Sequence, residues 1–188
     1  LSIKLLVRSR NGIKLTREGE KLYPFIENSI AQYRLIYEKA NEILGLETGI
    51  IRIGTISSIS CHWLPDLIKE FQEKYPMVQF SLQQGDYTSI PEWIRNGTVD
   101  FGFINPDAVN GLETEFIKKG EMVALLPKDH KLVNKKELKL EDLENEKFIL
   151  LEEGHFSEPL NEFESKKLKP NLKFRIHDDY AIMTMVEA

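Results

Sequence analysis

Apolar side chains recur at alternating spacings of four and three residues between about Glu18 and Leu46. This period predicts one long helix with a heptad seam, which is typical of a helix that pairs with a second copy of itself. An amphipathic helix that packs on its own domain is the alternative. The seam residues that we expect to carry dimerisation are Leu22, Ile26, Tyr33, Ile36 and Ile43.

The region after this helix alternates between strand and helix patterns. Apolar runs or period-two alternation predict strands at residues 50–56, 78–84 and 99–104. Helical patterns cover residues 61–75 and 89–97, where Pro76 and Gly97 follow as stop signals. Strands joined by helices in this order predict a parallel sheet with helical crossovers.

The second half of the chain shows the same kind of alternation less regularly. We expect strands at residues 112–119, 121–126 and 147–151, followed by an extended stretch at residues 172–177. Helices are predicted at residues 140–143 and 159–168, and a last one begins near Tyr180. The two halves together therefore indicate an α/β protein.

The start of the chain combines a turn signal with positive charge. Asn11-Gly12 suits a tight hairpin turn, and Arg8, Arg10 and Lys14 surround it. Thr16 is placed to cap the following helix, with acidic residues in the first turn. Residues 1–21 hold six basic and two acidic side chains, a net charge of +4, whereas the whole chain carries −5. A basic head on an acidic body favours nucleic-acid contact by the head alone.

These features resemble the wing and linker helix of LysR-type transcriptional regulators. The matching wing residues are Leu5, Leu6, Arg8, Gly12, Leu15, Thr16 and Gly19, although the family usually has Phe at the position of Leu6. The body adds the runs Ile51-Arg52-Ile53-Gly54, Tyr75-Pro76-x-Val78, Asn96-Gly97-x-x-Asp100-Phe101-Gly102 and Leu126-Pro127-x-x-His130-x-Leu132. The chain stops before the family pattern ends, so we interpret it as a fragment.

The resemblance implies a fold and a division into domains. It implies a periplasmic-binding-protein-like (type II) effector domain of two α/β subdomains, preceded by a long dimerisation helix and the wing of a winged helix-turn-helix. The expected parts are a wing remnant at residues 1–17, the linker helix at 18–46, an incomplete subdomain I at 50–117 and an incomplete subdomain II at 118–188.

Candidate effector contacts follow from the carboxyl ends of the predicted strands. Ligands of open parallel sheets bind beyond these ends, and family regulators take effector contacts from the same loops. The residues concerned are Ser57, Ser58, Ser60, Asn105, Glu153, His155 and Phe156. Simple helix capping is the alternative for the serines. Hydroxyls and free N–H groups at a helix start favour an anionic effector.

The remaining chemistry-bearing residues do not form a catalytic or metal-binding set. Cys61 is the single cysteine, and the adjacent Cys61-His62 pair cannot face each other on a helix. The spacing of the histidines fits no metal site, so we expect no cofactor, no metal and no enzymatic activity. Neither a signal peptide nor a membrane-spanning run is apparent, which predicts a cytoplasmic protein.

The sequence thus predicts a LysR-type regulator of transcription that forms homodimers or homotetramers. Its expected partners are promoter DNA, a small-molecule effector and a second copy of itself. The expected DNA contacts in the wing are Arg8, Arg10, Lys14 and Thr16. A solute-binding protein of the same fold that does not bind DNA is the alternative.

Overall fold

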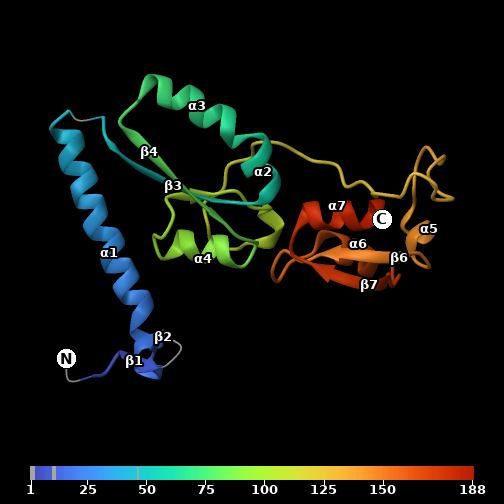
Figure 1. Ribbon diagram of the computed structural model, residues 1–188, viewed down its shortest axis with the longest axis horizontal. Coiled ribbons are helices and arrows are strands. Elements are labelled where there is room, and N and C mark those ends of the chain that lie inside the picture. The colour runs from blue at the N-terminus through green and yellow to red at the C-terminus, as the bar shows by residue number, and fades with distance from the viewer. Residues whose placement is uncertain (1–2, 10–11, 46) are drawn as a thin grey trace. The chain divides into compact units, whose positions relative to one another are not determined.

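The computed structural model describes residues 3–9, 12–45 and 47–188, and its contacts divide the chain into two compact units (Figure 1). Unit 1 consists of Leu1–Gly85 and Ile90–Phe103, and unit 2 of Asp86–Ser89 and Ile104–Ala188. The chain therefore passes briefly into unit 2 at residues 86–89 before it returns. The subdomain boundary between residues 117 and 118 stays a prediction.

The chain begins with a hairpin of β1 (Leu6–Ser9) and β2 (Gly12–Leu15), which pair in antiparallel fashion. Ser9 pairs with Gly12, so Gly12 belongs to the second strand and not to the turn as predicted. Its φ of +109° is one that side chains rarely adopt. Arg10 and Asn11, which were predicted to lie in or beside this turn, are outside the described residues.

The long helix α1 (Arg17–Ile43) follows the hairpin directly. The predicted cap is confirmed, because the Thr16 hydroxyl accepts a hydrogen bond of 2.9 Å from the backbone N–H of Gly19. Gly19 is buried, and a Cβ at this position would lie 2.2 Å from the carbonyl oxygen of Leu5. Glycine thus allows the start of α1 to pack tightly against the backbone of Leu5, just before β1. The helix ends before Gly45, whose φ of +68° cannot continue it.

Unit 1 contains the predicted parallel sheet. Its strands are β3 (Gly49–Thr55), β4 (Val78–Gln84) and β5 (Phe101–Gly102), in the order β4-β3-β5. Both neighbours pair with β3 in parallel, which confirms the predicted crossover topology. The apolar side chains buried around this sheet include Ile53, Leu64, Ile90 and Val99.

Helices cover both faces of this sheet (Figure 1). The helix predicted at residues 61–75 is confirmed for α3 (Leu64–Lys74), but its first residues belong to a separate helix, α2 (Ser57–His62), with a break at Trp63. Pro65 explains the break, since it has no N–H to donate to a carbonyl one turn earlier. On the other face, α4 (Ser89–Arg95) packs closely: a Cβ on Gly102 would lie 2.5 Å from Ile90.

Unit 2 is built on β6 (Lys147–Leu151) and β7 (Asn171–Ile176), which pair in parallel. Its helices are a short 3-10 helix η1 (Pro106–Ala108), α5 (Leu140–Leu143), α6 (Glu158–Ser165) and α7 (Asp179–Glu187). Leu150 and Phe163 are almost fully buried at its centre. The ring of Phe163 meets that of Phe148 edge to face at a centroid distance of 5.7 Å.

The two strands predicted at residues 112–119 and 121–126 are wrong. Both stretches are irregular, and neither enters a ladder among the described residues. Most of their apolar side chains are exposed, including Phe116 at 77% and Val123 at 81%. A strand requires a neighbour to take its backbone hydrogen bonds, so an apolar pattern alone is insufficient here.

No helix in the described part of the chain is long and apolar enough to cross a bilayer.

Candidate functional site

The three candidate serines lie in or beside the first turn of α2, immediately after β3. The hydroxyl of Ser60 is turned inward, where it bonds to the Thr55 hydroxyl at 3.2 Å and the Ile56 carbonyl at 3.1 Å. Ser58 is exposed. The hydroxyl of Ser57 accepts a hydrogen bond of 2.6 Å from the Gln84 side chain, and its own proton is then available to donate to a ligand. Of the three serines, Ser57 is therefore the one best placed to donate a hydrogen bond to an acceptor group of a ligand.

His155 connects three segments of unit 2. Its Nδ1 lies 2.9 Å from the Thr88 hydroxyl, and its Nε2 lies 3.0 Å from the carbonyl oxygen of Ala108. Because a carbonyl only accepts, the hydrogen-bond network assigns the proton to Nε2 and makes Nδ1 the acceptor of the Thr88 proton. The backbone N–H of His155 also donates to the Thr88 hydroxyl at 2.9 Å. Both ring nitrogens of His155 thus bind protein groups, and the side chain holds its loop in place.

Glu153 lies among other carboxylates in unit 2. Burial raises its pKa to about 7, and the negative charges of Glu158, Asp179 and Asp86 contribute to the rise in that order. The nearby Tyr87 is buried, and burial together with the charge of Glu153 raises its pKa as well. The backbone N–H of Tyr87 donates to the carbonyl oxygen of Glu153 at 3.0 Å. Near neutral pH this carboxyl can therefore hold or release a proton.

Asn105 and Phe156 join the same cluster. The Asn105 amide donates to Glu158 at 2.7 Å, while its side-chain oxygen accepts from the backbone N–H of Asp107 at 3.0 Å. The ring of Phe156 meets the ring of Tyr87 at a centroid distance of 6.1 Å and an angle of 72°. The structure thus brings Asn105, Glu153, His155 and Phe156 together around residues 86–89 of unit 2.

Three residues of these two sites were missed in the sequence. Gln84 is the last residue of β4, so the rule about carboxyl ends of parallel strands would have found it. Tyr87 and Glu158 gave no comparable signal. Tyr87 follows β4 within an unremarkable polar loop, and Glu158 opens α6 after the cap residue Ser157. Only the tertiary contacts bring these two side chains to the candidate residues.

The β1–β2 hairpin, which was predicted to be a DNA-contacting wing, presents its positive charges on two faces. Arg8 pairs with Ile13, and Val7 with Lys14. Because paired residues share one face of the ribbon and neighbours alternate, Arg8 and Lys14 leave from opposite faces. Both side chains are exposed. The hydroxyl of Thr16 is already engaged, since it caps α1 and also donates to the carbonyl oxygen of Lys4 at 2.7 Å. Arg10, the remaining candidate, is not among the described residues.

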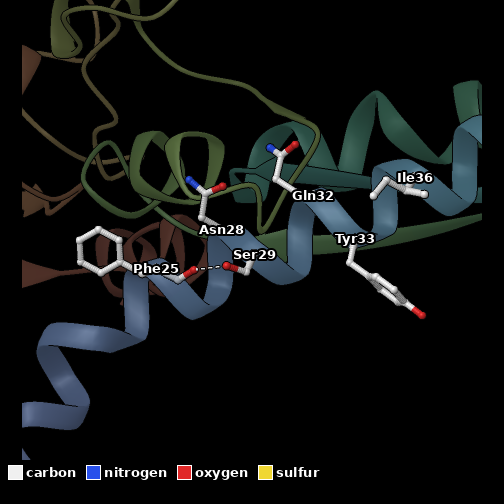
Figure 2. A pocket seen from close by; sticks show the side chains of 6 residues that line it. All are labelled: Phe25, Asn28, Ser29, Gln32, Tyr33 and Ile36. Carbon is white, nitrogen blue, oxygen red and sulfur yellow. Dashed lines mark hydrogen bonds between the residues drawn. The ribbon is translucent and has the colours of Figure 1, made fainter. Parts of the chain in front are cut away.

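The predicted seam of α1 lies on an open apolar face. The side chains of Ile26, Tyr33, Ile36 and Ile43 are 41%, 60%, 67% and 78% exposed, and Leu22 is half-buried. A shallow depression runs along this part of α1 (Figure 2). Its lining residues are Phe25, Asn28, Ser29, Gln32, Tyr33 and Ile36. Large apolar side chains on one helix face are typical of a surface that packs against a partner.

No group of three or more His, Cys, Asp or Glu side chains within the described ranges is arranged to hold a metal ion. Cys61 is exposed and free. In the cluster around Glu153 the Thr88 hydroxyl is paired with the His155 ring, but the same hydroxyl also accepts the backbone N–H of His155, so this pair holds the loop in place. What these side chains offer is a set of donors and acceptors suited to holding a polar molecule.

Comparison with known proteins identifies the family of the chain. Residues 44–188 match the LysR substrate binding domain family. The chain belongs to the LysR family. Its relatives include the transcriptional dual regulator GltC of Bacillus subtilis (strain 168), which is 31% identical over 156 residues that cover 82% of this chain and 52% of GltC. The chain spans 52% of the length of GltC and 64% of the length of YvbU of Bacillus subtilis (strain 168), which is 29% identical over 99% of this chain.

Solved structures show the same fold. The effector binding domain of QuiR in complex with shikimate is 22% identical, with a TM-score of 0.63 over 74% of this LysR chain and 69% of that one. Full-length CbnR in complex with its target DNA is 18% identical, with a TM-score of 0.57 over 96% of this chain and 64% of CbnR. The α/β effector-domain fold with a long N-terminal helix is thereby confirmed. The relatives are transcriptional regulators, which agrees with the prediction that the chain is not an enzyme.

Proposed function

We propose that the protein is a DNA-binding regulator of transcription that senses a small polar molecule between the two α/β subdomains of its LysR domain. The observation that carries this proposal is the continuity of three parts in one chain: an exposed basic wing, a long helix with an open apolar face and a LysR substrate binding domain. A solute-binding protein needs only the last of these.

The candidate side chains limit the chemistry of the effector. On unit 1, Ser57 has a hydroxyl proton to donate, which supports an acceptor group such as a carboxylate or carbonyl. On unit 2, Glu153 and Glu158 present carboxylate oxygens, which accept hydrogen bonds. We therefore expect an effector with both acceptor and donor groups, instead of one that is purely anionic. QuiR, which is bound to shikimate, provides a precedent for a polar ligand in this fold.

The effector acts on DNA binding by its difference in affinity between two arrangements of the protein. Paired α1 helices hold two wings at a fixed spacing, which sets the separation of two DNA half-sites. In this scheme Arg8, Arg10 and Lys14 contact phosphates and position the protein, whereas they do not read the base sequence. A protein that acts on promoter DNA works in the compartment that holds the DNA, so a cytoplasmic location belongs to the same proposal.

Binding of the full-length protein to DNA upstream of its own gene tests the proposal. We expect fluorescence anisotropy to show dissociation constants of about 10⁻⁸ M or tighter, and much weaker binding to a scrambled sequence. Replacing Arg8 or Lys14 with Ala should reduce the slope of log affinity against log salt by about 1 for each phosphate that is no longer neutralised. Lys39→Ala, an exposed change on α1 away from the wing, is the matched control.

Equal and weak binding to both DNAs, abolished by salt, would favour the alternative of a solute-binding protein. A specific interaction that Arg8→Ala and Lys14→Ala leave unchanged would keep the regulator but remove the wing from the interface. The two results are distinguishable because the first concerns the parent protein and the second only its variants.

Oligomeric state tests the role of α1. Replacing both Ile26 and Ile36 with Asp places charges on the open apolar face, so we expect monomers in sedimentation or light-scattering measurements. Leu35→Asp is the control, because Leu35 is also exposed, at 52%, but lies outside the seam. A double variant that keeps the parent's oligomeric state would show that the subunits associate elsewhere.

A further inference from the structure

Helix α1 has a second face that contacts the rest of unit 1. Glu27, Ala31 and Glu38 are spaced by four and seven residues, so they lie along one side of the helix. At about 100° per residue, Ile36 of the apolar seam lies about 180° around the helix from Glu27. The two faces of α1 therefore have different tasks, and the polar one is already occupied within the same chain.

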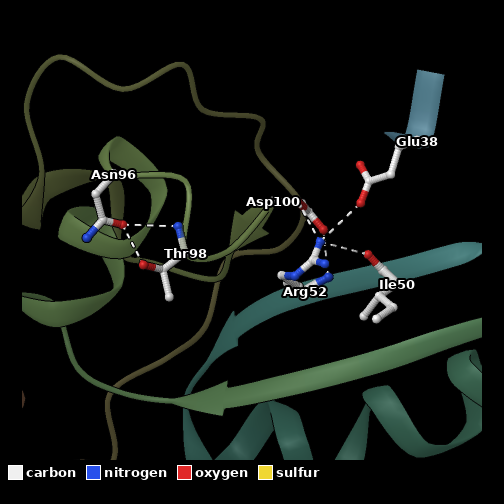
Figure 3. Close-up of polar contacts among 6 residues, drawn as sticks. All are labelled: Glu38, Ile50, Arg52, Asn96, Thr98 and Asp100. Atoms are coloured by element: carbon white, nitrogen blue, oxygen red, sulfur yellow. Dashed lines mark hydrogen bonds and ion pairs between the residues drawn. The ribbon is translucent and has the colours of Figure 1, made fainter. Parts of the chain in front are cut away.

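The first contact of this face is an ion pair with the central strand β3 (Figure 3). Nη1 of Arg52 donates to Glu38 at 3.2 Å and to the carbonyl oxygen of Ile50 at 3.2 Å. The same atom lies 3.8 Å from the Asp100 carboxylate, whose other oxygen accepts the backbone N–H of Arg52 at 2.7 Å. The Arg52 side chain is only 17% exposed. Asp100 thus positions the guanidinium that binds α1.

The second and third contacts come from the turn after α4. The Asn96 amide donates to Glu27 at 3.1 Å. Its oxygen accepts two hydrogen bonds from Thr98, from the backbone N–H at 3.0 Å and from the hydroxyl at 2.7 Å, which fixes the orientation of the amide (Figure 3). The next residue, Gly97, has a φ of +72°, and a Cβ there would lie 2.5 Å from the Cβ of Ala31. Glycine therefore allows the turn to touch buried Ala31.

We infer that the contacts Glu27–Asn96, Ala31–Gly97 and Glu38–Arg52 form a latch that holds α1 and the β3 sheet of unit 1 as one rigid piece. All three partners on the sheet side belong to β3 or to the turn that leads into β5. The same strand β3 ends at the Ser57 loop. A structural change at the Ser57 loop is therefore connected to α1 through strand β3, which also carries Arg52.

The length of α1 makes the latch consequential. A helix of 27 residues is about 40 Å long, so a tilt of about 10° at one end moves the other by about 7 Å. An attached helix transmits any rotation of the sheet to the wing, whereas a detached one does not. That regulatory meaning rests on the proposed function, but the latch itself is a property of this chain and is testable without DNA or effector.

Distances between spin labels in the full-length protein test the latch. With Cys61→Ser as background, labels are placed at two exposed positions, Asn28→Cys on α1, about 100° around the helix from Glu27, and Glu73→Cys on α3. Labelled subunits are mixed with an excess of unlabelled ones, so that the distance within one subunit dominates. We expect a single narrow distribution in the parent, and a broad or shifted one in Glu27→Ala/Glu38→Ala and in Ala31→Leu.

Two controls separate the latch from general loosening. Glu27→Gln/Glu38→Gln keeps both hydrogen-bond acceptors and should retain the narrow distribution. Glu42→Ala removes an exposed carboxylate that pairs only locally with Lys39, and it should also leave the distribution unchanged. A parent distribution that is already broad overturns the latch. A narrow distance distribution in Glu27→Ala/Glu38→Ala or in Ala31→Leu also overturns it. So does a broadened distribution in a variant that has lost helix content in circular dichroism.

Discussion

The loops at the strand ends of the two units differ in charge. In unit 1 the loop after β3 is neutral, and its contacts join hydroxyls and an amide at Ser57, Ser60 and Gln84. In unit 2 the loop after β6 holds Glu153 close enough to Glu158 for their charges to interact. Both units use parallel strands, so the topology does not decide the electrostatics. The carboxyl whose pKa is raised to about 7 therefore belongs to the loop of unit 2, and we expect the stability of unit 2 to change with pH near neutrality.

The cores differ as well. Unit 1 places helix α4 against its sheet at glycines, whereas unit 2 fills its centre with the aromatic ring of Phe163. The chain also offers a probe that separates the units, because both of its tryptophans, Trp63 and Trp93, belong to unit 1. Tryptophan fluorescence therefore reports the unfolding of unit 1, and amide hydrogen exchange of unit 2 peptides reports the stability of unit 2.

The largest effect is expected for Ile90→Ala. Ile90 is fully buried between α4 and the sheet, so the cavity should lower the free energy of unfolding of unit 1 by about 2–5 kcal/mol. Denaturant titration followed by tryptophan fluorescence measures this decrease. Ile50→Ala is the control, since Ile50 is 41% exposed and should cost much less. Equal decreases in both variants would contradict a core centred on Ile90.

Gly102→Ala tests the close packing of α4 on the sheet by adding an atom instead of removing atoms. The added methyl group would lie 2.5 Å from Ile90, and overpacking of this kind lowers the free energy of unfolding by about 1–3 kcal/mol. The same fluorescence titration applies. The matched control is Gly49→Ala, also in unit 1, where a Cβ meets nothing within 4 Å. If Gly102→Ala is as stable as Gly49→Ala, then α4 can move away from the sheet at little cost.

Glu153→Gln tests the pH response of unit 2. Its pKa is raised from 4.5 to about 7, so the folded protein keeps a proton that the unfolded chain releases between these values. Stability from this group is complete below pH 4.5 and is lost as the pH rises through 7. Allowing for its partial exposure, we expect the parent to lose about 1–2 kcal/mol of unit 2 stability over this window.

The Gln variant should lack most of that pH-dependent decrease in stability. Hydrogen exchange of unit 2 peptides at about pH 5 and about pH 8, corrected for the intrinsic exchange rate, measures the difference. Glu162→Gln, an exposed carboxylate on the same helix as Glu158, serves as the control and should keep the parent's pH dependence. Identical pH dependence in the two variants would show that Glu153 does not titrate in this range.

The smallest effect is expected for Gln84→Ala in the neutral loop. Removing one exposed hydrogen bond to Ser57 should lower the free energy of unfolding of unit 1 by about 0.5–1 kcal/mol and leave its pH dependence unchanged. Tryptophan fluorescence over the same pH range gives both quantities, with Gln79→Ala on the same strand as the control. A pH-dependent difference would mean that charge reaches the neutral loop after all.

Local patterns were reliable where an element contains its own partners. The cap at Thr16 and the long helix followed from spacing and capping residues, because their hydrogen bonds are local. The parallel β3 sheet followed from the alternation of strand and helix patterns, although β3 pairs with strands remote in sequence. The patterns failed at residues 112–126, where apolar alternation found no neighbouring strand among the described residues. They also misplaced the start of the helix predicted at residue 61, because they did not show the break at Trp63 that Pro65 imposes between α2 and α3.

The candidate sites show the same division. The strand-end rule selected Ser57, Asn105 and Glu153, but it could not tell that Ser60 is turned inward or that His155 uses both ring nitrogens on protein groups. Those outcomes depend on which segments meet. Thr88 and His155, for example, are 67 residues apart in the chain.

The order of most elements and the family could be predicted from the sequence, since periodicity, capping residues and motifs act over a few neighbouring positions. The fold was needed to find the pairing of Arg52 with Glu38, the gathering of carboxylates around Glu153 and the tight approach of Gly97 to α1. These depend on distances between residues remote in sequence, where burial and charge change the energy of a group far more than its local sequence does.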